Sequence, residues 1–113
     1  MKEKLYLCGP ITDNPGCEEE FAAAEAALKA AGYIVINPLK LHDREKEWEE
    51  YMKRDIKFLL DCDGITLLGD YKNARGCQLE IHIAFELSIK IARVDSWIRL
   101  KEKNVYQSAD VTA

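Results

Sequence analysis

The sequence contains no long apolar run and no basic stripe. None of its segments reaches about 18 consecutive apolar residues, so we expect no membrane-spanning helix. Residues 1–4 lead directly into a strand-like segment without the apolar stretch of a signal peptide, which predicts a cytoplasmic protein. The net charge is −4, and acidic and basic residues are mixed along the chain, so we expect no binding to nucleic acid polymers.

Patterns for metal sites and for standard nucleotide-phosphate sites are missing too. The histidines, His42 and His82, lack metal-ligand spacing. The loop after the first predicted strand contains neither G-x-G-x-x-G nor G-x-x-x-x-G-K-[ST], and the acidic residues 18–20 that follow it suit the helix dipole but would repel a phosphate. No two cysteines have C-x-x-C spacing and no secretion signal favours disulfides, so we expect reduced, mostly buried thiols. The cysteines are Cys8, Cys17, Cys62 and Cys77.

The composition is that of one small globular domain. Apolar residues make up 48% and charged residues 32% of the 113 residues. We expect a single domain over residues 1–113, with a core over 4–94 and a weakly patterned C-terminal extension over 95–113, frayed from residue 108. A domain this small gains stability from a partner subunit, and the aromatic-bearing extension needs a surface, which together predict a homo-oligomer.

Short apolar segments alternate with segments of helical periodicity. This alternation predicts βαβ units and an α/β fold, in which a parallel sheet of four to five strands carries helices on both faces. Gly32 fits the end of the first helix. The connections 9–16, 37–46 and 70–75 then lie at the carboxyl ends of the strands, where a ligand cleft is expected. The predicted strands are 4–8, 33–36, 64–69 and 91–94, and the predicted helices are 17–31, 47–62 and 76–90.

Two acidic residues lie on helix faces that the pattern predicts to be buried. Asp55 lies in the middle of an apolar face formed by Trp48, Tyr51, Met52, Leu59 and Cys62. Glu80 lies inside a second apolar stripe, formed by Leu79, Ile83, Ala84 and Leu87. Burial of an unpaired carboxylate is costly, and sites that need carboxyl groups with shifted pKa values place them this way. Structural ion pairs, and for Glu80 the helix dipole, are the alternative explanations.

A pair of carboxyl groups suits the chemistry of glycosidic bonds. One can attack or stabilise the anomeric carbon while the other donates a proton to the leaving group. Arg75 and Gly76 open the third predicted helix, where a guanidinium and helix N–H groups could form an anion subsite, for example for a 5′-phosphate; a solvated loop charge is the alternative. Tyr6 could direct its hydroxyl into the cleft or pack in the core, and Gly9 could let the backbone approach a ligand or form an ordinary turn.

Several segments of the sequence resemble one known family. They are 6–12 (YLCGPIT), 31–38 (AGYIVINP), 48–55 (WEEYMKRD) with 62–63 (CD), and 73–80 (NARGCQLE). Their content and order resemble the nucleoside 2-deoxyribosyltransferase-like superfamily, and within it a compact branch common in phage and bacteria. The resemblance extends over residues 4–90.

The resemblance implies a three-layer flavodoxin/Rossmann-like fold and assigns an active site. It implies that Glu80 is the nucleophile at C1′ of the sugar, that Asp55 lies in the same site, and that Tyr6 and Gly9 line the sugar pocket. Ala74 departs from the pattern, because phosphate-accepting relatives have a serine in this loop and the transferases have an aspartate six residues before the glutamate. The resemblance therefore leaves 5′-phosphate binding, base handling and transfer open. The other expected substrate-binding residues are Pro10, Asn73, Arg75 and Gly76.

These observations predict an enzyme that cleaves or transfers at the N-glycosidic bond of a (deoxy)nucleoside or a nucleoside 5′-monophosphate. Glu80 would attack C1′, Asp55 would assist proton handling at the base, and water or a second base would complete turnover. We expect the small molecule to be the partner, with no metal and no organic cofactor. Two alternatives stay open: a non-catalytic nucleotide-binding or sensing module, and a structural oligomeric scaffold.

Overall fold

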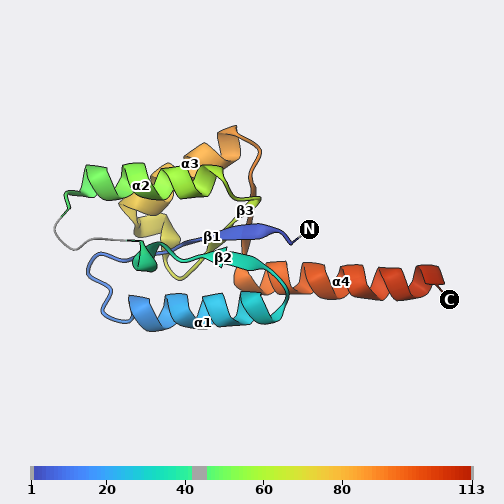
Figure 1. Ribbon diagram of the computed structural model, residues 1–113. Helices are drawn as coiled ribbons and strands as arrows, with labels where there is room; N and C mark the ends of the chain where they lie inside the picture. Colours follow the sequence, from blue (N-terminus) through green and yellow to red (C-terminus); the bar gives the residue numbers. More distant parts are fainter. Residues whose placement is uncertain (1, 42–45, 113) are drawn as a thin grey trace.

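Four parallel strands and four α-helices form the fold in a computed structural model, which describes residues 2–41 and 46–112, with side chains as far as residue 103. Helices α1 and α4 lie on one side of the sheet, and α2 and α3 lie on the other (Figure 1). The predicted α/β fold, with a parallel sheet between two helix layers, is therefore confirmed, with four strands. In chain order the elements are β1 (Lys4–Cys8), α1 (Cys17–Ala30), β2 (Ile34–Ile36), α2 (Trp48–Leu60), β3 (Gly64–Leu67), α3 (Arg75–Glu86), β4 (Lys90–Arg93) and α4 (Val94–Thr112).

The strand order is β2-β1-β3-β4, and every neighbouring pair is parallel. This order matches the first four strands of the flavodoxin-like arrangement, in which ligands bind outside the carboxyl ends of the strands at the point where the order reverses. In this sheet that point lies between β1 and β3. A short 3₁₀ helix at Pro38–Lys40 follows β2, and another at Tyr71–Asn73 follows β3, so both lie at this edge.

Strand β1 is buried on both faces, as expected for the middle of a parallel sheet. Side chains along a strand alternate between faces. Leu5 and Leu7 accordingly pack in the cluster that includes residues of α1 and α4, whereas Tyr6 and Cys8 pack in the cluster that includes residues of α2 and α3. The alternation therefore directs Tyr6 toward the two helices that carry Asp55 and Glu80.

Two helices end in the same hydrogen-bond pattern, but only one end was predicted. After α1, Gly32 has φ of 101°, and the Tyr33 N–H donates to the Leu28 carbonyl, which confirms Gly32 as the end of the helix. After α3, Ser88 takes the same role with φ of 59°, and the Ile89 N–H donates to the Ala84 carbonyl. The prediction that this helix continues to residue 90 was wrong, because a serine in the left-handed region carries no sequence signal.

The buried face of α3 also differs from the predicted stripe. Its buried residues are Cys77, Glu80 and Ala84, while Leu79 and Leu87 are 37% and 57% exposed. Small side chains on the buried face let the helix pack closely on the sheet, and the two leucines turn outward. The prediction of a buried Glu80 holds, although the apolar stripe assigned around it was partly wrong.

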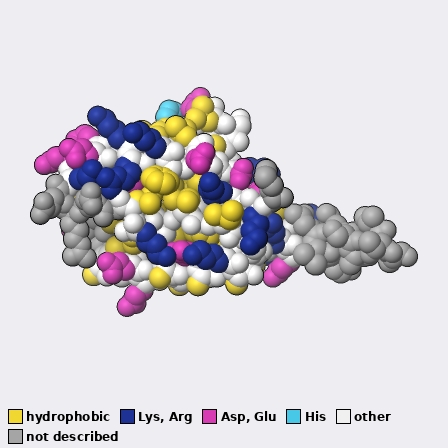
Figure 2. All heavy atoms as spheres, in the orientation of Figure 1, with side chains coloured by type: hydrophobic (Ala, Val, Ile, Leu, Met, Phe, Trp, Pro, Cys, Tyr) yellow, Lys and Arg dark blue, Asp and Glu magenta, His cyan; other side chains and the backbone are white. Residues whose placement is uncertain are grey.

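The C-terminal extension forms helix α4, which the weak pattern did not predict. The helix runs from Val94 to Thr112, so the backbone over 108–112 is helical rather than frayed. Trp97 is 2% exposed and packs in the core with α1 and β2 residues. Across the described ranges, no helix has the length and apolarity that a membrane crossing needs. Lysine and arginine side chains are scattered among acidic and apolar ones on the face shown in Figure 2.

Candidate active site

A cavity of about 920 Å³ opens at the carboxyl ends of the strands. Its walls come from the loop after β1, the 3₁₀ helix after β2, and the first turns of α2 and α3. The fold therefore brings together residues that lie up to 74 positions apart in the sequence. All eight residues singled out in the sequence line this cavity: Tyr6, Gly9, Pro10, Asp55, Asn73, Arg75, Gly76 and Glu80.

Two buried carboxyl groups lie in the cavity wall. Asp55 is 4% exposed on α2, and Glu80 is 5% exposed in the second turn of α3. The hydroxyl of the fully buried Tyr6 donates a hydrogen bond to Oε2 of Glu80. Tyr6 therefore packs in the core and also lines the cavity, so both interpretations of this residue in the sequence analysis hold.

Burial controls the ionisation of Glu80. Removal from water raises the pKa of this carboxyl, and the charge of Asp55 raises it further. Hydrogen bonds with Tyr6 and Cys8 act in the opposite direction but do not outweigh burial, so the pKa of Glu80 reaches about 8. Burial and the same two carboxyl groups raise the pKa of Tyr6 well above its ordinary value, so its hydroxyl stays protonated and can donate.

The raised pKa of Glu80 should make the free energy of unfolding depend on pH. The folded state holds this proton up to about pH 8, whereas a glutamate in the unfolded chain releases it near pH 4.5. Between these values the folded state binds more protons, so the contribution of Glu80 to stability is complete below pH 4.5 and is lost as pH rises through 8. We expect the Glu80→Gln variant, which cannot ionise, to gain stability relative to the wild type from pH 5 to pH 9 in urea unfolding.

The control for this prediction is Glu86→Gln, because Glu86 lies on the same helix with its side chain exposed. This variant should show the pH dependence of the wild type. Parallel stability curves for the wild type and Glu80→Gln over the same range would contradict the raised pKa.

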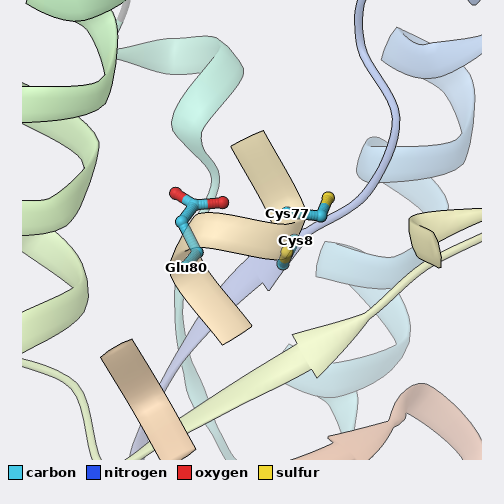
Figure 3. Close-up of side chains that lie close together, drawn as sticks. All are labelled: Cys8, Cys77 and Glu80. Carbon is cyan, nitrogen blue, oxygen red and sulfur yellow. The ribbon is translucent and has the colours of Figure 1, made fainter. Parts of the chain in front are cut away.

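Two cysteines lie beside Glu80, an arrangement that the sequence analysis did not predict. Cys8 comes from the end of β1, and Cys77 comes from α3 one turn before Glu80 (Figure 3). One donor atom from each of the three side chains lies within 4.8 Å of the others, close enough for a shared metal ion. The hydrogen bond with Cys77, together with burial, raises the pKa of the Cys8 thiol far above its ordinary range. A divalent ion would therefore have to displace a tightly held proton from Cys8. The side chains of Cys8 and Cys77 both line the cavity.

The prediction of reduced, mostly buried cysteines is confirmed for the described residues. All four cysteines are free, with Cys8, Cys62 and Cys77 buried and Cys17 half-buried. Of the histidines, His82 is exposed as expected, and His42 lies outside the described residues.

An arginine–tryptophan pair joins the first turns of α2 and α3 at the cavity. The guanidinium carbon of Arg75 lies 3.6 Å from the centroid of the Trp48 ring, and both side chains line the cavity. Arg75 is exposed, so its guanidinium meets solvent as well as the Trp48 ring. Nearby, the side-chain amide of Asn73 donates to a carboxylate oxygen of Asp70 at 2.7 Å.

Close packing explains the two glycines of the site. A Cβ atom on Gly9 would lie 2.8 Å from Cβ of Leu68, and one on Gly76 would lie 3.1 Å from Sδ of Met52. Gly9 therefore lets the loop pack against the end of β3, and Gly76 lets α3 approach α2. The sequence analysis explained Gly9 by a close approach to a ligand or by an ordinary turn, and did not predict this packing against Leu68.

Comparison with curated protein sequences finds no match. Among solved structures, the fold is similar to that of the 2-deoxyribosyltransferase from the psychrotolerant bacterium Bacillus psychrosaccharolyticus, which is described as a biocatalyst for the synthesis of antiviral and antitumoral nucleosides. The TM-score is 0.63 at 20% sequence identity, over 78% of this chain and 69% of that one. This similarity shows a shared fold. A family model described as a domain of unknown function, DUF4406, matches residues 3–93. Since this match extends over most of the sequence, the chain belongs to the DUF4406 family.

Proposed function

We propose that this protein cleaves or transfers at the N-glycosidic bond of a (deoxy)nucleoside or a nucleoside 5′-monophosphate. The observation that carries the proposal is the pair of buried carboxyl groups, Glu80 and Asp55, in one cavity, with Tyr6 hydrogen-bonded to Glu80. The fold shared with a 2-deoxyribosyltransferase supports it. A cavity of about 920 Å³ is within the size range of small-molecule sites.

In the proposed reaction, the ionised Glu80 carboxylate attacks C1′ of the sugar. The C1′–N bond breaks and its electron pair moves to the base, which takes up a proton with the help of Asp55. Water then displaces the carboxylate from C1′ and gives the free sugar, or a second base does so and gives a new nucleoside. Neither step calls for a metal or an organic cofactor.

The proposal gives the other cavity residues separate roles. The Tyr6 hydrogen bond to Oε2 would orient the Glu80 carboxyl group toward C1′. Gly9 and Pro10 would lie along the sugar. Asn73, at the end of the 3₁₀ helix before α3, and Arg75 and Gly76, at the start of α3, would contact the base or a 5′ substituent.

One observation favours a second function, a nucleotide-binding or sensing module without catalysis. A Glu80 pKa of about 8 leaves this residue mostly protonated at pH 7, and a protonated carboxyl is a poor nucleophile. It is a good hydrogen-bond donor to a ligand. The same cavity would then bind a nucleoside or nucleotide and leave it intact.

A substrate panel separates these functions. The wild-type protein is incubated with ribo- and deoxyribonucleosides and their 5′-monophosphates, with and without a second free base, and products are measured by chromatography. We expect release or exchange of the base from at least one member of the panel. Binding measured by calorimetry without any product would instead establish the sensing module, and neither binding nor product would contradict both.

A further inference from the structure

A third buried acid lies outside the proposed catalytic pair. Glu25 is 6% exposed on α1, which covers the opposite face of the sheet from α2 and α3 (Figure 1). Both of its carboxylate oxygens are occupied. Oε1 accepts a hydrogen bond from Nδ2 of Asn37 at 3.1 Å, and Oε2 lies 2.6 Å from Nζ of Lys29 and 2.9 Å from Nζ of Lys40.

These contacts divide into two kinds. Lys29 lies one turn further along α1, so its ion pair with Glu25 stays within that helix. By contrast, Asn37 caps the short 3₁₀ helix that follows β2, and Lys40 is the last residue of that helix, so their contacts connect α1 to another segment. Burial opposes the ionisation of Glu25, but the hydrogen bonds from its three partners outweigh it and lower the pKa of Glu25 to about 2. The connection is therefore ionic throughout the neutral pH range.

The connected segment is a wall of the cavity. Pro38 and Leu39 both line it. The Asn37 side chain is buried and held at both ends, because its Nδ2 donates to Glu25 while its Oδ1 accepts from the Leu39 N–H at 3.1 Å. Glu25 thus determines the orientation of the amide that caps the turn Pro38–Lys40. No side-chain atom of Glu25 itself lines the cavity.

We propose that Glu25 is a positioning residue, which fixes the Pro38–Leu39 wall of the cavity through Asn37 and Lys40 and thereby sets the affinity of the site for its ligand. The effect on affinity rests on the proposed function, whereas the effect on the wall does not. When the wall is already ordered, a ligand loses less free energy on binding, because it does not have to order the wall itself. Loosening the wall should therefore weaken binding more than it slows a reaction at Glu80.

The test compares Glu25→Gln, Lys40→Met and Lys29→Met. Amide hydrogen exchange at Leu39 reports the wall directly, because this N–H is held by Asn37. We expect exchange at Leu39 to rise about 10-fold or more in Glu25→Gln, several-fold in Lys40→Met, and less than about 2-fold in Lys29→Met. With an active substrate, KM should rise about 5–20-fold in Glu25→Gln while kcat stays within about 2-fold.

Lys29→Met is the matched control, because it removes an ion-pair partner of Glu25 without touching the wall segment. Equal exchange rates in the Lys29 and Lys40 variants would overturn the proposal, since Glu25 would then stabilise α1 alone. Unchanged exchange in Glu25→Gln, or a fall in kcat at constant KM, would overturn it as well. If Glu25→Gln does not fold, the contrast between the two lysine variants decides. If no substrate turns over, the proposed function fails while the exchange measurement still tests the wall.

Discussion

Replacement of Glu80 by glutamine is expected to lower base release about 10³-fold or more. Glutamine has nearly the same size and can still accept the hydrogen bond from Tyr6, so the cavity should keep its shape. It cannot form the proposed glycosyl ester at C1′, however. Chromatography of released base, with the substrate that turns over best, measures the rate. Calorimetry should show substrate affinity within about 3-fold of the wild type, since the variant loses chemistry rather than binding.

The pH profile of the wild type distinguishes a nucleophile from a proton donor. If ionised Glu80 attacks C1′, kcat/KM rises with pH until the carboxyl is fully ionised, through an apparent pKa near 8. If Glu80 instead donates a proton, kcat/KM falls over the same range. The exposed Glu86→Gln variant serves as the control and should retain the rate and profile of the wild type. Activity of Glu80→Gln within about 10-fold of the wild type would contradict the assignment of the nucleophile.

The fold could be predicted because its strands and helices differ strongly in pattern. Strand β1 is a fully buried run, and its predicted bounds, 4–8, are those observed. Gly32 marked the end of α1 since only glycine adopts its backbone conformation easily. Ser88 gives no such signal, and β4 is a half-buried edge strand, so the end of α3 was misplaced. Helix α4 begins at Val94, directly after β4 ends at Arg93, so no loop residues mark its start in the sequence.

Candidate site residues were recognisable where burial conflicts with chemistry. Asp55 and Glu80 are charged residues on faces that the helical period turns inward, and this conflict is visible in the sequence. Trp48 beside Arg75, and Cys8 beside Cys77, are pairs that depend on how α2, α3 and β1 are placed in space. The hydrophobic pattern gives no such distances. Glu25 was missed for another reason, since a glutamate in an Ala- and Glu-rich helix looks like any solvent-exposed one.

Loss of the Trp97 side chain is expected to be among the largest effects on stability. The residue is 2% exposed, its Nε1 donates to the Ile65 carbonyl at 3.4 Å, and its ring meets Tyr33 edge-on with centroids 5.8 Å apart. The absence of a side chain at Gly64 makes room for the indole, because a Cβ atom there would lie only 2.5 Å from it. Truncation of a buried aromatic residue leaves a large cavity, so Trp97→Ala should lower the free energy of unfolding by about 3–5 kcal/mol.

Urea denaturation measures this change, and Leu100→Ala provides the control on the same helix. Leu100 is an exposed side chain, so its truncation should cost less than about 1 kcal/mol. The family match ends at residue 93, and Trp97 lies beyond it. A large loss in Trp97→Ala would therefore show that the start of α4 belongs to the folding unit in this chain. A change below about 1 kcal/mol would instead show that the indole contributes little to the stability of the core.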